Sequence, residues 1–263
     1  FGVVSHIIPT FSRKPLFGYS SMVYATAAIA FLSFVVWAHH MFTVGMPIAG
    51  ELYFMYATML IAVPTGVKVF NWITTMYRGS LTYETPMLFS IAFVILFTFG
   101  GFTGMMLSIA AADMQYHDTY FVVAHFHYVM VAGAVFSGTA AVYYWLPKWC
   151  GKMYDETMGK VQFWIAFIGF NITFMPQHFL GLAGMPRRYA DYGLQFADWN
   201  MVSSIGAFMY GGAQILFLFN VIRTIGWGKP TNDPKVWEGA QGLEWTLPTP
   251  APYHTFATPP KIK

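Results

Sequence analysis

Long apolar stretches, separated by short polar segments, dominate the chain. A membrane-spanning helix needs about 20 consecutive apolar residues, and six stretches reach that length. They lie at residues 18–41, 53–76, 86–112, 120–147, 161–184 and 199–226. Residues 1–9 have the composition of the end of a further span. The pattern predicts an all-α transmembrane helix bundle with about six full spans plus the end of a seventh.

The same pattern divides the chain into two parts. Residues 1–226 form the predicted transmembrane core, and residues 227–263 form a predicted cytoplasmic C-terminal tail. The tail is rich in Pro, Gly and Thr, as in GKPTNDPK and LPTPAPYH, which favours irregular or extended chain. The chain opens on Phe1 without a basic segment, so we expect no signal peptide. We expect it to be the later part of a longer polypeptide, or one piece of a split one.

Basic residues are distributed unevenly between the two ends of the predicted bundle. The end with more Lys and Arg is expected to be cytoplasmic or to face a matrix. That end holds Arg13, Lys14, Arg78, Lys148, Lys152, Lys160, Arg223, Lys229, Lys235, Lys261 and Lys263. The opposite end holds only Arg187 and Arg188, and Lys68 lies within a span.

Composition excludes several classes of protein. Hydrophobic residues make up 56% of the chain and charged residues 10%, whereas soluble proteins carry about 25% charged residues. A soluble monomer, a disordered chain and a nucleic-acid-binding protein are therefore excluded. The single cysteine, Cys150, rules out a disulfide framework and a cysteine-ligated zinc or iron–sulfur site.

Four of the eight histidines lie in spans as two close pairs. His125 and His127, in VVAHFHYVM, are two residues apart, which is a rotation of about 200° on a helix. Their rings therefore leave on nearly opposite faces, which suits two separate metal centres. The alternative is a pair of hydrogen-bonded histidines in the bundle core.

The adjacent His39 and His40, in VVWAHHMFTVG, would both reach one copper, zinc or iron ion if the helix end is distorted. The alternative for them is an interfacial pair beside Trp37.

Lys68, in AVPTGVKVF, is a lysine inside a span with no acidic residue nearby in sequence. Such a lysine can carry protons. Thr65 lies on the same helical face and could share a water chain with it, while Pro64 and Gly66 would loosen the local helix. The alternative is a snorkelling lysine.

Two loops at the less basic end carry the remaining candidate residues. The segment AADMQYHDTY contains Asp113, His117 and Asp118, and an adjacent His-Asp pair can bind a divalent ion. The segment GMPRRYADY contains Arg187 and Arg188. Paired arginines bind carboxylates well, and haem propionates are carboxylates.

Five motifs closely resemble subunit I of haem–copper terminal oxidases: WAHHMFTVG, PTGVKVF, HDTYFVVAHFHYV, MPQHFLGL and GMPRRYADY. The motifs occur in the same order as in that subunit and extend across nearly the whole chain. They correspond to the region from the end of the subunit's sixth helix through its twelfth. The resemblance therefore implies the later part of a twelve-helix subunit.

The resemblance also implies roles for the candidate residues. His39 and His40 resemble two of the three ligands of the active-site copper, His125 the ligand of the high-spin haem iron, and His127 one ligand of the low-spin haem iron. The resemblance also implies that the haem propionates are bound or approached by Arg187, Arg188 and Asp113, and that an outer magnesium ion is bound by His117 and Asp118. It further implies that Ser5, Thr65 and Lys68 form a proton path.

The motifs His-Asp-Thr-Tyr and Pro-Arg-Arg-Tyr resemble cytochrome c oxidases of the aa3 type, and the tail LEWTLPTPAPYHTF resembles bacterial subunits. The implied activity is reduction of dioxygen to water with electrons from cytochrome c, coupled to proton pumping, with two haems (haem A), copper and magnesium. The implied partners are the N-terminal half of subunit I, subunits II and III, cytochrome c and the lipid bilayer. The implied location is the bacterial cytoplasmic membrane, with the mitochondrial inner membrane as second choice.

Several groups that the family needs are expected upstream of Phe1. They are the third copper ligand with its linked tyrosine, the second ligand of the low-spin haem, and the acids of another proton path. We therefore expect the chain to function only together with the N-terminal half of the subunit, which would supply these groups. The competing hypotheses are a quinol-oxidising relative, a transporter that uses Lys68 as its coupling group, and a cofactor-free scaffold. His6, His178 and Cys150 receive no functional assignment.

Overall fold

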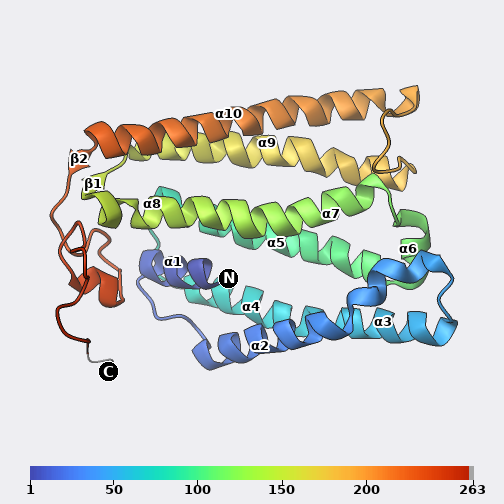
Figure 1. Ribbon diagram of the computed structural model, residues 1–263, viewed down its shortest axis with the longest axis horizontal. Helices are drawn as coiled ribbons and strands as arrows, with labels where there is room; N and C mark the ends of the chain where they lie inside the picture. Colours follow the sequence, from blue (N-terminus) through green and yellow to red (C-terminus); the bar gives the residue numbers. More distant parts are fainter. Residues whose placement is uncertain (261–263) are drawn as a thin grey trace.

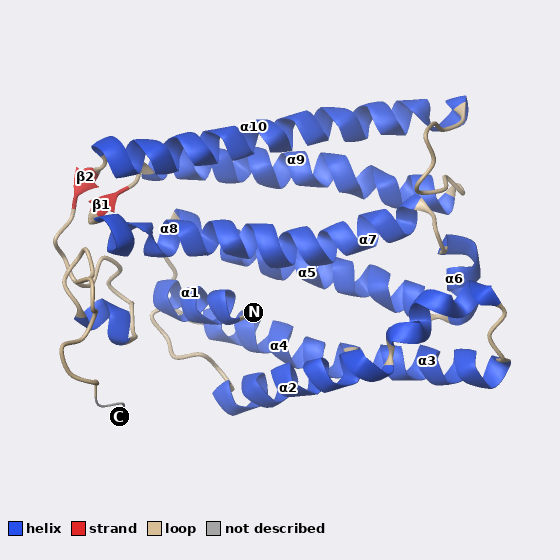
Figure 2. Cartoon of the chain, in the orientation of Figure 1, coloured by secondary structure: helices blue, strands red, loops and turns tan. Residues whose placement is uncertain are grey.

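The computed structural model describes residues 1–260 and consists of long helices that run nearly parallel (Figures 1 and 2). Six helical segments are long and apolar enough to cross a membrane, which confirms the predicted transmembrane bundle. They are Tyr19–Val44, Ile48–Met76, Thr85–Ser108, Tyr120–Cys150, Glu156–Leu182 and Leu194–Trp227. Lys261 and Lys263, two of the lysines predicted at the basic end, lie outside the described residues.

Four of the spans contain a change of helix type or direction. The first joins α2 (Tyr19–Val35) to the 3₁₀ segment η1 (Trp37–Val44), and the second joins α3 (Ile48–Leu60) to α4 (Ala62–Met76). The fourth runs from α7 (Tyr120–Met130) through the π-helical η2 (Val131–Phe136) to α8 (Ser137–Cys150). In the sixth, the short 3₁₀ segment η3 (Leu194–Phe196) leads directly into α10 (Ala197–Trp227). The remaining helices are α1 (Gly2–Ser12), α5 (Thr85–Ser108), α6 (Ala110–Tyr116) and α9 (Glu156–Leu182).

The breaks have local causes. Pro64 has no N–H to donate to the carbonyl of Leu60, and its ring crowds that carbonyl, so the second span is interrupted at Ile61. The third span was predicted to reach residue 112 but ends at Ser108. Ile109 adopts an extended conformation (ψ 110°), and α6 then starts in a new direction.

Helices α9 and α10 lie side by side along their length (Figure 1). They pack closely because glycines face each other across their interface. A Cβ on Gly169 would lie 2.8 Å from the backbone nitrogen of Tyr210, and one on Gly206 would lie 2.5 Å from that of Thr173. Small residues are the usual means of close helix contact in membranes. The hydroxyl of Ser203 also donates to the carbonyl of Thr173 across the interface (2.7 Å). These contacts fix the register of α10 against α9.

Asp155 caps the N-terminus of α9. Its side chain accepts a hydrogen bond from the backbone N–H of Met158 (3.0 Å), and Arg223 of α10 donates to its other oxygen (2.9 Å). The Met158 N–H and the Arg223 guanidinium hold the pKa of this carboxyl below its usual value. The contact ties the basic ends of α9 and α10 together.

The tail after Trp227 is mostly irregular, as expected, but it is docked on the bundle. It contains the strand β2 (Lys229–Pro230), paired antiparallel with β1 (Lys152–Met153), and the 3₁₀ turn η4 (Leu243–Thr246). Lys148 of α8 is buried beneath the tail, and its Nζ donates to the carbonyls of Leu247 (2.6 Å) and Pro234 (3.1 Å). The tail residues Trp237, Ala240 and Trp245 belong to the main apolar core. The tail therefore covers the basic end of the bundle.

Candidate functional site

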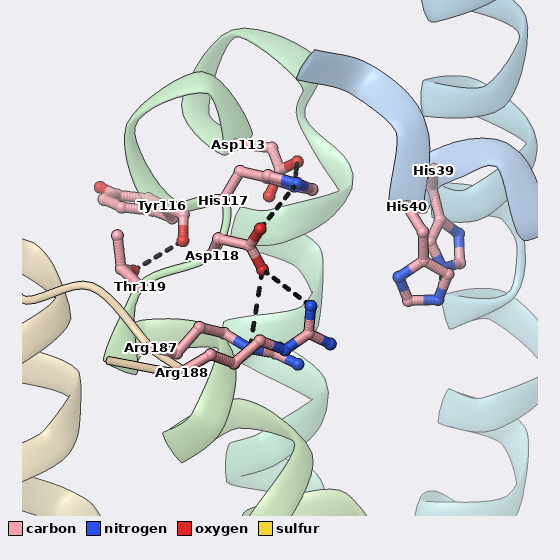
Figure 3. Close-up of polar contacts among 9 residues, drawn as sticks. All are labelled: His39, His40, Asp113, Tyr116, His117, Asp118, Thr119, Arg187 and Arg188. Atoms are coloured by element: carbon pink, nitrogen blue, oxygen red, sulfur yellow. Dashed lines mark hydrogen bonds and ion pairs between the residues drawn. The ribbon is translucent and has the colours of Figure 1, made fainter. Parts of the chain in front are cut away.

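His39 and His40 lie side by side on η1, beyond the end of α2 (Figure 3). Their Nε2 atoms are 3.1 Å apart. Two nitrogens that bind one tetrahedral ion, each at about 2.0 Å, would be roughly 3.3 Å apart. The segment is distorted, with non-helical dihedrals at Met41. The pair thus has the geometry of two ligands of one ion, at a distorted helix end as the sequence suggested.

Thr58 of α3 determines where His39 carries its proton. The Thr58 hydroxyl donates to the carbonyl of Phe54 (2.5 Å), so its oxygen is left to accept from Nδ1 of His39 (3.1 Å). A proton on Nδ1 leaves the lone pair on Nε2, the atom that faces His40. No sequence signal marks Thr58 as this partner, because it lies 19 residues away on another helix.

His125 faces α5. Its Nδ1 lies 2.9 Å from the carbonyl oxygen of Gly100 and 3.1 Å from the hydroxyl of Thr103, which itself donates to Gly100. Both neighbours act as acceptors, so Nδ1 carries the proton and Nε2 keeps its lone pair. A histidine held by a carbonyl at one nitrogen and free to ligate at the other is the usual arrangement in metal sites.

The His125 ring fits against α5 only because position 104 is a glycine. A Cβ on Gly104 would lie 2.8 Å from Cε1 of His125. Gly100 and Gly104 form a G-x-x-x-G pattern on one face of α5. This pattern is a sequence signal for close helix contact, and it could have indicated where His125 packs.

His127 faces the opposite way, toward α9. Its Nδ1 donates to the carbonyl of Val123 (2.7 Å), and its ring stacks on Phe174 of α9 with a centroid distance of 4.1 Å. As for His125, the hydrogen bond leaves the lone pair on Nε2. The two histidines therefore face different neighbours, His125 toward α5 and His127 toward α9, each with the lone pair on Nε2.

An ionic cluster lies at the less basic end, near the His39–His40 pair (Figure 3). His117 contacts Asp113 through Nδ1 (3.3 Å) and Asp118 through Nε2 (3.8 Å). Arg187 and Arg188 approach the other oxygen of Asp118 at 3.6 Å and 3.9 Å. Burial raises the pKa of the Asp113 carboxyl above its usual value, and His117 opposes this shift.

Backbone contacts fix this cluster. The N–H of Arg187 donates to the carbonyl of Asp118 (2.8 Å), and the N–H of Tyr120 donates to the carbonyl of Met185 (3.0 Å). The guanidinium of Arg187 also lies over the ring of Phe126, at 5.8 Å from its centroid. Arg187 is thereby held beside α7, over the residue that separates His125 from His127.

The predicted magnesium ligands do not by themselves form a site for that ion. Both oxygens of Asp118 already face cationic or imidazole groups, and Mg²⁺ prefers six oxygen ligands. Within residues 1–260, no group of three or more His, Cys, Asp or Glu side chains converges as a metal site. A magnesium ion would need oxygen donors from elsewhere.

The three residues of the predicted proton path are not hydrogen-bonded to one another. The hydroxyl of Thr65 donates to the carbonyl of Ile61 in its own helix (2.8 Å), and Ser5 accepts a hydrogen bond from the indole of Trp72 (2.9 Å). Lys68 instead donates to Thr26 of α2 (2.6 Å). Thr26 had no distinguishing sequence signal, because it is one hydroxyl in an apolar span.

Comparison with known proteins identifies relatives of this chain. Residues 1–209 match the family model "Cytochrome C and Quinol oxidase polypeptide I". Over 99% of its length the chain is 55% identical to cytochrome c oxidase subunit 1 of Cereibacter sphaeroides, covering 46% of that protein. Over 100% of its length it is 54% identical to the subunit of the same name from Bacillus sp. (strain PS3), covering 43%.

A structural comparison supports the same fold. A chain of a haem–copper terminal oxidase dimer, solved by cryo-EM, superposes with a TM-score of 0.71, covering 81% of this chain and 43% of that one. The sequence identity of 19% restricts this likeness to the fold. The chain spans about half the length of the curated relatives it matches.

Proposed function

The chain belongs to the family of cytochrome c and quinol oxidase polypeptide I, and on that premise we propose that it provides part of the dioxygen-reducing centre of a terminal respiratory oxidase. The observation that carries the proposal is the arrangement of four histidines. His125 and His127 present free Nε2 atoms on opposite faces of α7, and those of His39 and His40 converge at 3.1 Å.

The donor atoms suit the cofactors of the family. Imidazole nitrogens are good ligands for iron and copper. In this proposal His125 would bind the high-spin haem iron, His127 the low-spin haem iron, and His39 with His40 the copper ion. When bound, the haems and copper supply the redox chemistry that reduces dioxygen to water.

The chain's own residues orient these ligands. Gly100 and Val123 hold the rings of His125 and His127 through their carbonyls, and Thr58 holds His39. Arg187 and Arg188 contact Asp118 only at 3.6–3.9 Å, so their remaining N–H groups can bind carboxylates such as haem propionates. Asp113 would lie near the propionate of the high-spin haem.

Lys68 would deliver protons from the basic end, together with Ser5 and Thr65. Because these side chains are not hydrogen-bonded to one another, water molecules would have to link them. The assignment of His117 and Asp118 to magnesium stays a prediction that requires further oxygen donors.

The six apolar helices and the bacterial relatives make this a multi-pass protein of the bacterial cytoplasmic membrane. We propose cytochrome c as the electron donor, haem A as the haem type, and proton pumping coupled to the reaction. The partners would be the N-terminal half of subunit I and subunits II and III. Two relatives named cytochrome c oxidase subunit 1 support this choice over a quinol donor.

A reduced minus oxidised absorption spectrum of the complete complex, with and without CO, tests the proposal. We expect two haem populations, of which only one shifts with CO, and band positions characteristic of haem A. Oxidation of reduced cytochrome c, but not of quinol, is expected in turnover. A complex without haem would overturn the proposal and favour a transporter that uses Lys68.

Substitution of Gly104 by alanine tests the environment of His125. The new Cβ would collide with the imidazole ring, so we expect the content of CO-reactive haem to fall about tenfold, as for loss of an outer-shell contact in a metal site. Gly101→Ala is the matched control, since a Cβ there meets nothing within 4 Å. The haem-to-protein ratio measures the effect. Equal ratios in the two variants would contradict the predicted role of His125.

A further inference from the structure

Lys68 is held inside the bundle by a partner from another helix. Its side chain is 2% exposed, and its Nζ lies 2.6 Å from the hydroxyl oxygen of Thr26 on α2. The Nζ also lies 4.8 Å from the ring centroid of Phe1 and 5.5 Å from that of Trp72. Among residues 1–260, no carboxylate forms an ion pair with Lys68.

The hydroxyl of Thr26 acts as an acceptor at this contact. Its own proton is directed to the carbonyl of Met22, one turn earlier on α2 (2.8 Å). An ammonium group has only donors, so Lys68 donates and Thr26 accepts. The contact therefore favours a charged Lys68 and fixes the position of its Nζ against α2.

Other hydroxyl groups near Lys68 in sequence or in the predicted path are engaged elsewhere. Thr65 donates to the carbonyl of Ile61, and Ser5 accepts from the indole of Trp72. A charged amine in an apolar environment needs polar partners to replace water. The ring faces of Phe1 and Trp72 supply part of this stabilisation, and Thr26 supplies the hydrogen bond.

We propose that Thr26 is a positioning residue for proton transfer through Lys68: its hydroxyl oxygen holds the protonated amine between α2 and α4. The inference rests on the proposed function, in which Lys68 carries protons to the reaction centre. Thr26 does not itself relay protons, because its O–H is bonded to Met22. Its part is to keep the charged amine stable and aligned while the proton is in transit.

Three variants of the complete oxidase complex test this role. Thr26→Val keeps the shape of the side chain and removes the acceptor, while Thr26→Ser keeps the hydroxyl. Ser33→Ala is the matched control, because Ser33 lies on the same helix, is exposed, and among residues 1–260 hydrogen-bonds only to the carbonyl of Ile29. The readouts are the rate of CO-reactive haem reduction after rapid mixing with dithionite, and proton uptake followed with an indicator dye.

We expect Thr26→Val to slow both readouts about tenfold, the loss that follows removal of a hydrogen bond to a charged group. Reduction of the low-spin haem and both haem spectra should be unchanged. Thr26→Ser should restore the rate, and Ser33→Ala should match the wild type. Adding Thr26→Val to Lys68→Met should have no further effect, because the two residues act as one unit.

The outcomes separate this inference from the proposed function. A wild-type rate in Thr26→Val, together with a slow Lys68→Met, would overturn the role of Thr26 alone. A wild-type rate in Lys68→Met would overturn the proton path itself. Additive effects in the double variant would show that Thr26 acts independently of Lys68, which would also reject the inference.

Discussion

Replacement of His125 by alanine is expected to remove the CO-reactive haem and to reduce oxygen consumption more than about 100-fold, since loss of an outer-shell partner alone costs roughly 10–100-fold. The low-spin haem should remain, because His127 lies on the opposite face of α7 against Phe174. The CO-induced shift in the reduced spectrum and the oxygen-consumption rate measure the two effects. The reciprocal variant, His127→Ala, should lose the low-spin bands.

His178→Gln is the matched control for this prediction. His178 is also buried, contacts the carbonyl of Met175 through Nδ1 (3.3 Å), and packs against Phe99 and Phe121. It has no place in the proposed cofactor sites, so both haem populations should be retained. Loss of the CO-reactive haem in His178→Gln but not in His125→Ala would show that the ligand was misassigned.

Replacement of Lys68 by methionine is expected to slow reduction of the high-spin haem more than about 100-fold while the low-spin haem is reduced at the normal rate. The amine is the one titratable side-chain group in α4. Methionine preserves the length and apolar contacts of the side chain but cannot carry a proton. Stopped-flow absorption at the bands of the two haems distinguishes their rates.

Lys160→Met provides the control for loss of a lysine. Lys160 lies at the basic end of α9, is 44% exposed, and pairs with Glu156 at 3.6 Å. Such exposed pairs contribute little to stability, so normal reduction of both haems is expected. Normal turnover in Lys68→Met would end the interpretation of Lys68 as part of a proton path.

The transmembrane architecture was predictable because each span is a local property of the sequence. Length and apolar character identify a span without reference to any other segment, and six spans were located within a few residues in most cases. The largest errors at a start were five residues, in the second, fifth and sixth spans, which begin at Ile48, Glu156 and Leu194 rather than at residues 53, 161 and 199. The third span ends early at Ser108, because the dihedrals of Ile109, which the apolar pattern does not reveal, turn the chain into α6.

Part of the candidate site was predictable for the same reason. The opposed directions of His125 and His127 follow from the period of a single helix. The proximity of His39 and His40 follows from their adjacency, and the presence of Lys68 within a span follows from its position in the chain. The roles of these residues came from motifs that resemble a known family rather than from geometry.

The sequence by itself therefore determined the spans, the basic end of the bundle, the opposed directions of His125 and His127, and the proximity of His39 and His40. Only the tertiary structure decided which helix each side chain meets: Thr58 for His39, Gly104 for His125 and Thr26 for Lys68. Helix formation depends on hydrogen bonds between residues four apart, which a local sequence pattern reports. Contacts between helices depend on the packing of distant segments, in which small residues and single hydroxyl groups set the separation and the partner.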